Sequence, residues 1–179
     1  KMYNAYMTSK IHADITDYLE SHSLVDFPIL ESALLDAILK HHGITNVKNK
    51  EIALVLKQHS VTSGELAHLI NTHIELPSIQ HILTLYELRV SPQGRKLDGA
   101  YYTPQTLVDS IVDLTLQKNV GSVCDPACGS GAFLLGAVKK LYANGAGTID
   151  KILSNLIYGV DIDKSNVEYT KRVVSLYDI

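Results

Sequence analysis

The sequence predicts a helix-rich α/β fold, with an N-terminal all-helical region followed by a truncated, Rossmann-like α/β unit. Two patterns in the 179 residues carry this prediction. Apolar residues recur at three- and four-residue spacing through the first half, which is the period of helices that bury one face. In the second half, two short apolar runs, 120–124 and 156–160, each end at an acidic residue and lead into a helical pattern, as strands of parallel sheets do.

The first half is predicted to form helices over residues 10–24, 28–41, 50–58, 63–72 and 77–90. Turn-forming residues separate them, among them Gly43, Pro77 and the stretch 91–94. We therefore expect a helical region at 1–90 and the N-terminal half of an α/β domain at 91–179.

The helices 50–58 and 63–72 have the form of a helix-turn-helix. The second of them carries Glu65 and His68 but no Arg, Lys, Asn or Gln before Asn71, so it offers few side chains that could read DNA bases. The pattern favours packing onto the second unit over a DNA-reading role.

Composition indicates a cytoplasmic protein. No apolar stretch is long enough to cross a membrane, and no charged start followed by an apolar run marks a secretion signal. With a net charge of −3, the chain has no overall positive charge that would attract DNA. Cys124 and Cys128 lack the second pair that a zinc site needs, and the histidines show no His-x-x-x-His spacing, so no metal site is expected.

The segment 125–134, Asp-Pro-Ala-Cys-Gly-Ser-Gly-Ala-Phe-Leu, predicts a cofactor-binding loop between a strand and a helix. A dinucleotide fingerprint would have a third glycine at the position of Leu134, and a P-loop would have Lys and Ser or Thr in place of Ala132 and Phe133. These differences argue against dinucleotides and ATP as ligands. The loop instead suits a ligand that has a cationic amine and a ribose but no phosphate. S-adenosylmethionine fits that description.

The second apolar run ends at Asp161. An acid at the tip of the second strand accepts hydrogen bonds from both ribose hydroxyls, because a carboxylate has two oxygens. Ile162 follows it and offers an apolar edge to an adenine ring.

A third element precedes both runs. Thr103 is expected at the N-cap of a helix and Pro104 at its first position. The unpaired amides of this helix end lie beside the aromatic pair Tyr101 and Tyr102. They could bind a carboxylate such as that of methionine.

In this order, residues 99–104, 125–134 and 159–163 resemble the G-x-Y-[YF]-T-P, D-P-A-C-G-S-G-x-[FL]-L and G-x-D-I-[DN] motifs of N6-adenine DNA methyltransferases of restriction-modification systems. The order is that of the gamma class, and the resemblance is strongest to type I modification subunits and fused type IIG enzymes. It begins at Leu85 and covers about half of the chain.

The resemblance implies a Rossmann-like, S-adenosylmethionine-dependent methyltransferase unit. The segment 101–104 would contact the methionine end of the cofactor. The segment 125–131 would surround its amino-acid part and its ribose, and Asp161 would bind the ribose hydroxyls. The predicted cofactor-binding residues are Tyr101, Tyr102, Thr103, Pro104, Asp125, Ala127, Cys128, Gly129, Ser130, Gly131, Asp161 and Ile162.

The family's catalytic loop, Asn-Pro-Pro-Tyr or Asn-Pro-Pro-Phe, holds the exocyclic amine of a flipped adenine. The chain contains no Asn-Pro, and its one Asp-Pro belongs to the glycine loop. We therefore expect a fragment that carries no catalytic residue and is inactive alone. Double-stranded DNA, and a specificity subunit or restriction domain, would be partners of the parent protein.

Two other functions stay open. The same Asn-Pro-Pro-Tyr chemistry serves methyltransferases that act on protein glutamine or on RNA, although the Tyr-Thr-Pro motif favours DNA. The helical region could also be a subunit-docking module without activity in isolation.

Overall fold

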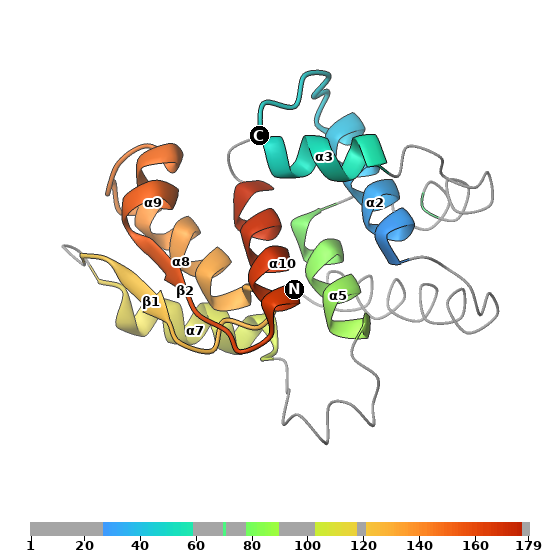
Figure 1. Ribbon diagram of the computed structural model, residues 1–179. Helices are drawn as coiled ribbons and strands as arrows, with labels where there is room; N and C mark the ends of the chain where they lie inside the picture. The colour runs from blue at the N-terminus through green and yellow to red at the C-terminus, as the bar shows by residue number, and fades with distance from the viewer. Residues whose placement is uncertain (1–26, 59–69, 71–77, 90–102, 118–120, 177–179) are drawn as a thin grey trace. The chain divides into compact units, whose positions relative to one another are not determined.

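The computed structural model describes residues 27–58, 70, 78–89, 103–117 and 121–176 (Figure 1). The chain divides into two compact units, residues 1–89 and 90–179. None of the helices in the described ranges is both long and apolar enough to span a membrane. The predicted helix 10–24 and nearly all of 63–72, and with it the second half of the helix-turn-helix pattern, lie outside the described residues.

The first unit contains α2 (Phe27–His41), α3 (Lys50–Gln58) and α5 (Ile79–Arg89), and α2 packs against both of the others. These bounds agree with the predicted helices 28–41, 50–58 and 77–90 to within a few residues. Residues 30–35 of α2 and 82–86 of α5 are buried without a break, whereas the buried residues of α3, Ile52 and Val55, lie three positions apart. The buried apolar side chains of these three helices are Leu30, Ala33, Leu34, Leu35, Ile38, Leu39, Ile52, Val55, Ile82, Leu83, Leu85 and Tyr86.

A buried polar contact joins α2 to α5. The hydroxyl of Tyr86 donates a hydrogen bond of 2.6 Å to Oε1 of Glu31, and both residues are 2% exposed. Because a buried carboxylate is costly unless it is hydrogen-bonded, this contact fixes how the two helices pair.

Polar residues cap two helices of the first unit at their N-terminal ends. The Oδ1 atom of Asn49 accepts hydrogen bonds from the amides of Glu51 and Ile52 at the start of α3. At the start of α5, Nδ1 of His81 accepts from the amide of Ser78 at 2.9 Å. Each cap satisfies amides that have no partner within the helix.

The second unit contains α7 (Gln105–Thr115), β1 (Val123–Asp125), α8 (Ala132–Ala143), α9 (Ile149–Asn155), β2 (Ile157–Gly159) and α10 (Lys164–Ser175). The two strands are parallel, with Val123 opposite Ile157 and Asp125 opposite Gly159. These elements agree with the helix-rich α/β fold that the sequence predicts.

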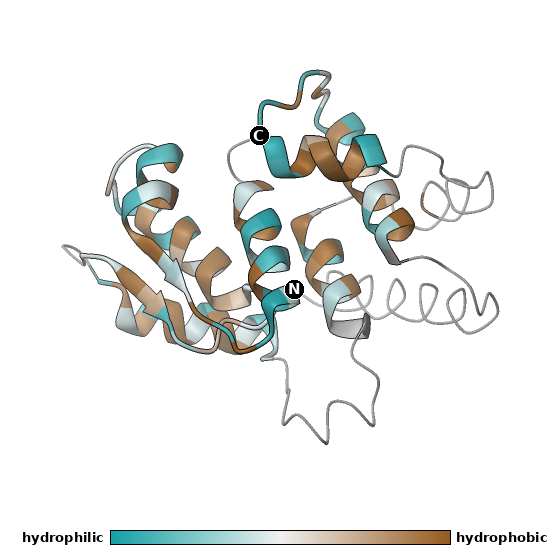
Figure 2. Cartoon of the chain, in the orientation of Figure 1, coloured by the Kyte–Doolittle hydropathy of each residue, from teal (hydrophilic) through white to brown (hydrophobic). Residues whose placement is uncertain are grey.

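Helix α8 is the centre of this unit. It contacts α7, α9, α10 and both strands, and Figure 2 shows it largely in the brown of hydrophobic residues. One core cluster lies between α7 and α8, and a second lies between α8 and α9. The clusters are Val108, Val112, Leu116 and Ala137, and Val138, Leu141 and Ile152.

The start of α7 differs from the prediction. Pro104, and not Thr103, occupies the N-cap position, and no side chain caps the helix there. Pro104 has φ −55° and ψ 140°, so its ring fixes a helical φ while its ψ stays extended. The predicted N-cap role of Thr103 is therefore wrong.

Candidate functional site

The candidate site lies where β1 and β2 end. Their chains stay paired beyond the strands, because the amide of Val160 donates to the carbonyl of Asp125 and the amide of Cys128 donates to the carbonyl of Val160, both at 2.9 Å. The glycine loop, defined as residues 125–131, is thereby held beside residues 160–163. The carboxyl ends of parallel strands are the usual position of ligand sites in α/β folds.

Two glycines give the loop its shape. Gly129 has φ 53° and Gly131 has φ 92°. Residues other than glycine rarely adopt a positive φ. The amide of Gly131 closes the turn on the carbonyl of Cys128 at 2.8 Å. A Cβ atom on Gly129 would meet no atom of the described residues within 4 Å, whereas one on Gly131 would lie 3.0 Å from Oγ1 of Thr170. Gly129 therefore borders open space, and Gly131 is needed for close packing.

The carboxylate of Asp161 is bound by the chain itself. Its Oδ2 accepts from the amide of Gly129 at 2.8 Å, and its Oδ1 accepts from the amide of Asp163 at 2.8 Å and from Nδ2 of Asn166 at 3.1 Å. Since a carboxylate has about four acceptor positions, about one remains, on Oδ2. The structure thus gives Asp161 a role in holding the loop that the sequence pattern did not predict.

The hydrogen bonds on Asp161 also control its ionisation. Partial desolvation raises the pKa of this carboxyl, but the bonds from Asp163, Gly129 and Asn166 together lower the pKa below its ordinary value. The group is therefore charged over the whole neutral range.

Asp125 ends β1 and is half-buried. Its Oδ1 accepts a hydrogen bond from the amide of Ala127 at 3.1 Å, and no described residue donates to its Oδ2. Among the described residues, this oxygen is therefore left without a hydrogen-bond donor.

The other predicted residues of the loop differ in exposure. Ala127 is exposed, while Cys128 and Ser130 are buried. Burial raises the pKa of the Cys128 thiol; the nearby carboxylates of Asp161 and Asp125 add to this, and a hydrogen bond with Thr170 opposes it. Cys128 thus packs as a neutral thiol.

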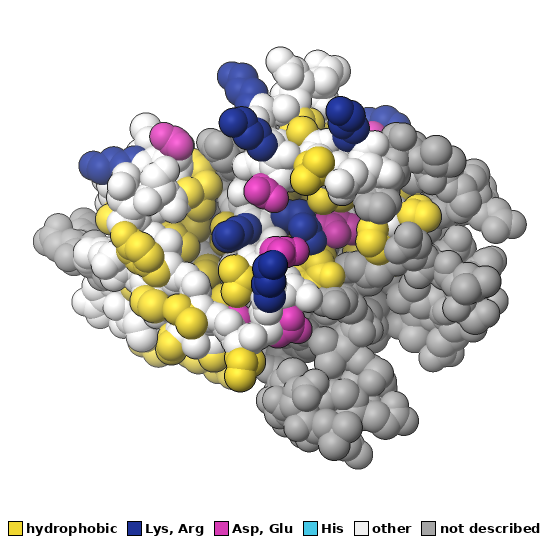
Figure 3. Space-filling view, viewed as in Figure 1, with side chains coloured by type: hydrophobic (Ala, Val, Ile, Leu, Met, Phe, Trp, Pro, Cys, Tyr) yellow, Lys and Arg dark blue, Asp and Glu magenta, His cyan; other side chains and the backbone are white. Residues whose placement is uncertain are grey.

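The remaining predicted residues lie apart from these bonds. Ile162 is fully exposed, and neither Thr103 nor Pro104 hydrogen-bonds to the described residues of the loop. Tyr101 and Tyr102 lie outside the described residues. Figure 3 shows hydrophobic side chains gathered over the part of the chain that carries the sheet, where Tyr158, Val160 and Ile162 are exposed.

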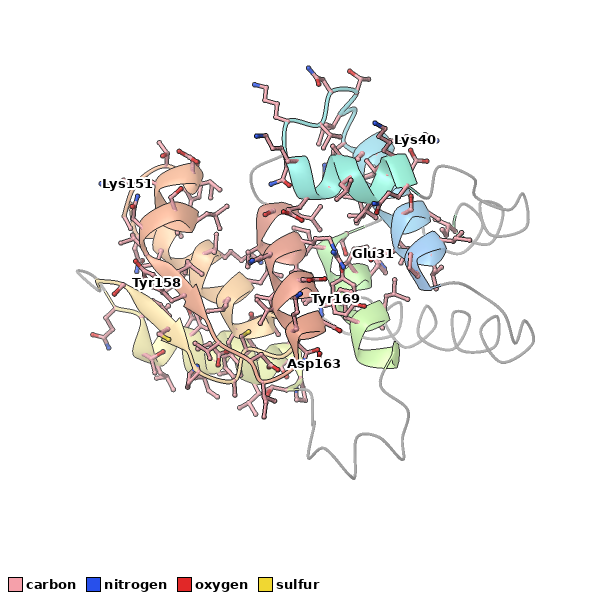
Figure 4. All side chains as sticks on the ribbon, viewed as in Figure 1. Glu31, Lys40, Lys151, Tyr158, Asp163 and Tyr169 are labelled. Carbon is pink, nitrogen blue, oxygen red and sulfur yellow. The ribbon has the colours of Figure 1, made fainter. Side chains whose placement is uncertain are left out.

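Helix α10 contributes residues that the sequence pattern did not single out. Asp163, labelled in Figure 4 at the start of α10, accepts from the amide of Ser165 at 2.8 Å and is the N-cap. Asn166 bonds Asp161, and the hydroxyl of Thr170 donates to the carbonyl of Gly129 at 2.9 Å. An acid directly before a helical pattern is a recognisable N-cap signal, but nothing in the sequence marks the partners of Asn166 and Thr170.

Comparison with known proteins places residues 83–179 under the family model described as N-6 DNA Methylase. Over 76 residues the chain is 46% identical to the type I restriction enzyme MjaIX methylase subunit of Methanocaldococcus jannaschii, covering 42% of this chain and 13% of the relative. Over 172 residues it is 32% identical to the type II methyltransferase M.VspI of Vibrio sp. (strain 343), covering 94% of this chain and 36% of the relative. No solved structure gives a significant match.

Proposed function

This chain belongs to the N-6 DNA methylase family, and on that premise we propose that it supplies the S-adenosylmethionine-binding part of an adenine-N6 DNA methyltransferase in a restriction-modification system. The observation that carries the proposal is the glycine loop, which is fixed against the end of β2 by the bond between Gly129 and Asp161. The unit would be the first part of a Rossmann-like fold, in which a ligand lies across the carboxyl ends of neighbouring strands.

The groups around this loop fit the proposed cofactor. The space beside Gly129 is open, so a ligand can approach the backbone there. The unbonded oxygen of Asp125 suits the ammonium group of the methionine part, and the remaining acceptor of Asp161 suits one ribose hydroxyl. The exposed side chain of Ile162 offers an apolar surface to the adenine ring.

The bound cofactor would supply an electrophilic methyl group. The part of this chain is to bind and orient it: Asp125 and Asp161 place negative charge beside a cationic ligand, and the loop holds its backbone in one conformation before binding. A loop ordered in advance loses less conformational entropy when the ligand arrives.

The methyl acceptor is proposed to be the exocyclic amine of an adenine in double-stranded DNA. Because the sequence contains no Asn-Pro-Pro-Tyr or Asn-Pro-Pro-Phe segment, we propose that residues outside these 179 hold the flipped base. The chain spans 13% and 36% of the two relatives, which leaves such residues ample room in a longer protein. The similarity to a type I methylase subunit supports partner subunits, a specificity subunit among them.

Calorimetry tests the cofactor assignment. We expect this chain to bind S-adenosylmethionine and S-adenosylhomocysteine but not NAD or ATP. Asp125→Asn keeps an oxygen for the amide of Ala127 and removes the charge, so it should weaken binding by about tenfold, while Asp150→Asn, on the exposed surface of α9, should not change it. Equal binding of NAD, or no binding of either adenosyl ligand, would overturn the proposal.

The substrate needs a separate measurement on the parent methyltransferase. Transfer of a labelled methyl group from S-adenosylmethionine is compared among duplex DNA, RNA and a glutamine-containing peptide. Product carrying N6-methyladenine in duplex DNA supports the proposed acceptor. Label in RNA or in the peptide alone would replace DNA as the substrate and leave the cofactor site intact.

A further inference from the structure

We propose that Thr170 is a positioning residue that holds the glycine loop in its ligand-ready conformation and so sets cofactor affinity; the consequence for affinity rests on the proposed function. Thr170 lies on α10 and is 4% exposed. Its hydroxyl donates to the carbonyl of Gly129 at 2.9 Å, across 41 residues of sequence. The helix after β2 is thereby tied to the loop after β1.

The acceptor of this hydrogen bond is unusual for a hydroxyl group on a helix, because it lies outside that helix. Such groups commonly donate to the carbonyl four residues earlier in their own helix. Thr84, Ser110 and Thr115 do so, with the carbonyls of Gln80, Thr106 and Ile111. Thr170 instead uses its donor on a different segment, which makes the bond tertiary.

Thr170 also explains why residue 131 is glycine. A Cβ atom on Gly131 would lie 3.0 Å from Oγ1, 3.1 Å from Cγ2 and 3.3 Å from Cα of Thr170. The threonine side chain therefore fills the space that Gly131 leaves, while it bonds the carbonyl of Gly129. One residue thus contacts both positive-φ glycines of the loop.

A second hydrogen bond from α10 also helps to hold Gly129 in place. Nδ2 of Asn166, one helical turn before Thr170, donates to Asp161, whose other oxygen accepts from the amide of Gly129. The amide and the carbonyl of Gly129 are therefore both held, one through Asp161 and one by Thr170. The face of Gly129 that borders open space stays available to a ligand.

The test uses Thr170→Val, which keeps the shape and removes the donor, and Thr170→Ser, which keeps the donor. Thr84→Val is the matched control, because Thr84 is a buried helical threonine that bonds within its own helix. In the absence of ligand, Thr170→Val should speed hydrogen exchange of the amides of residues 128–131 by about tenfold, with Thr170→Ser within about twofold of wild type and Thr84→Val unchanged there.

Binding of S-adenosylhomocysteine is the second readout. Thr170→Val should raise its Kd by roughly five- to tenfold, and Thr170→Ser should restore it. Two results would overturn the role of the hydroxyl. One is an unchanged hydrogen-exchange rate of the amides of residues 128–131 in Thr170→Val. The other is weaker S-adenosylhomocysteine binding in Thr170→Ala that Thr170→Val does not share. If the wild-type chain binds no S-adenosylhomocysteine, the proposed function fails, while the exchange measurement still decides whether Thr170 holds the loop.

Discussion

The backbone amide of Gly129 donates a hydrogen bond of 2.8 Å to Oδ2 of Asp161, a residue 32 positions further along the chain. The acid at the tip of β2 therefore stabilises the loop that follows β1, in addition to any contact with a ligand. Its removal should therefore lower the stability of the fold as well as weaken the proposed cofactor binding, so stability and binding are measured separately.

Asp161→Asn is expected to lower the free energy of unfolding by about 1–2 kcal/mol. An amide has a single acceptor oxygen, so its NH₂ group would face at least one of the donors Gly129, Asp163 and Asn166. Urea unfolding followed by circular dichroism measures the loss. Glu168→Gln, an exposed change on α10, is the control. Equal stability of the two variants would show that the bonds to Asp161 contribute nothing.

The same carboxyl predicts a pH dependence. Its pKa is lowered in the folded chain, so the unfolded chain takes up the proton at a higher pH and stability falls in acid. The stability difference between wild type and Asp161→Asn should be constant above about pH 5 and should shrink as the pH falls below about 3.9 toward the lowered folded pKa. Urea titrations at several pH values test this, and a difference that grows in acid would contradict it.

Much of the second unit could be predicted from the sequence because its signals are local. The apolar runs that end in Asp125 and Asp161 predicted parallel strands, and β1 and β2 lie there. Thr148 before a short amphipathic segment marks the start of α9, and its side chain accepts from the amide of Lys151. These patterns depend on residues within a few positions of one another.

The contacts of the site could not be predicted, because they join residues far apart in the sequence. Nothing near Asp161 indicates that Gly129 is its donor, and nothing near Thr170 indicates that its hydroxyl leaves its own helix. The start of α7 was missed for a local reason. Thr103-Pro104 looks like an N-cap followed by a first-turn proline, but the ψ of proline is not fixed by its ring, and here it is extended.

Gly159→Ala is expected to destabilise the second unit by about 1–3 kcal/mol. A Cβ atom there would lie 2.7 Å from Cδ1 of Leu134, a buried side chain, and 3.2 Å from Sγ of Cys128. Gly121→Ala is a matched control, since a Cβ there would lie more than 4 Å from the part of the chain that the structure describes, its own chain neighbours aside. Thermal unfolding of the two variants side by side gives the comparison; equal midpoints would mean that α8 can move away from β2 without cost.

His81 predicts a pH response in the first unit. Burial lowers the pKa of this imidazole, although the protonated ring can donate from Nδ1 to the carbonyl of Ser78, which raises the pKa. The unfolded chain therefore binds the proton first, and stability should decline as the pH falls from about 6.5 toward the lowered folded pKa. A proton NMR titration should give a midpoint below about 6.5 for His81, and His42→Gln, an exposed change, should leave it unaltered. A midpoint above that value would contradict the prediction.

The two cysteines should differ in reactivity. Cys124 is exposed, whereas Cys128 is buried and burial raises its pKa, so less of it is present as thiolate at neutral pH. Iodoacetamide at mildly alkaline pH should therefore label Cys124 at least about tenfold faster, as followed by mass spectrometry. Denaturing urea should remove the difference. Equal rates in the folded chain would show that the glycine loop opens freely.

The spacing of the contacts to Gly129 bears on how the protein is made. The ribosome synthesises the glycine loop well before its partners, since Asp161 follows Gly129 by 32 residues and Thr170 by 41. Until α10 has left the exit tunnel, the loop retains the conformational entropy of an open chain segment. The loop therefore reaches its final conformation only once α10 has been synthesised and docks on it, and the proposed cofactor cannot act as a template for folding this part of the chain before then.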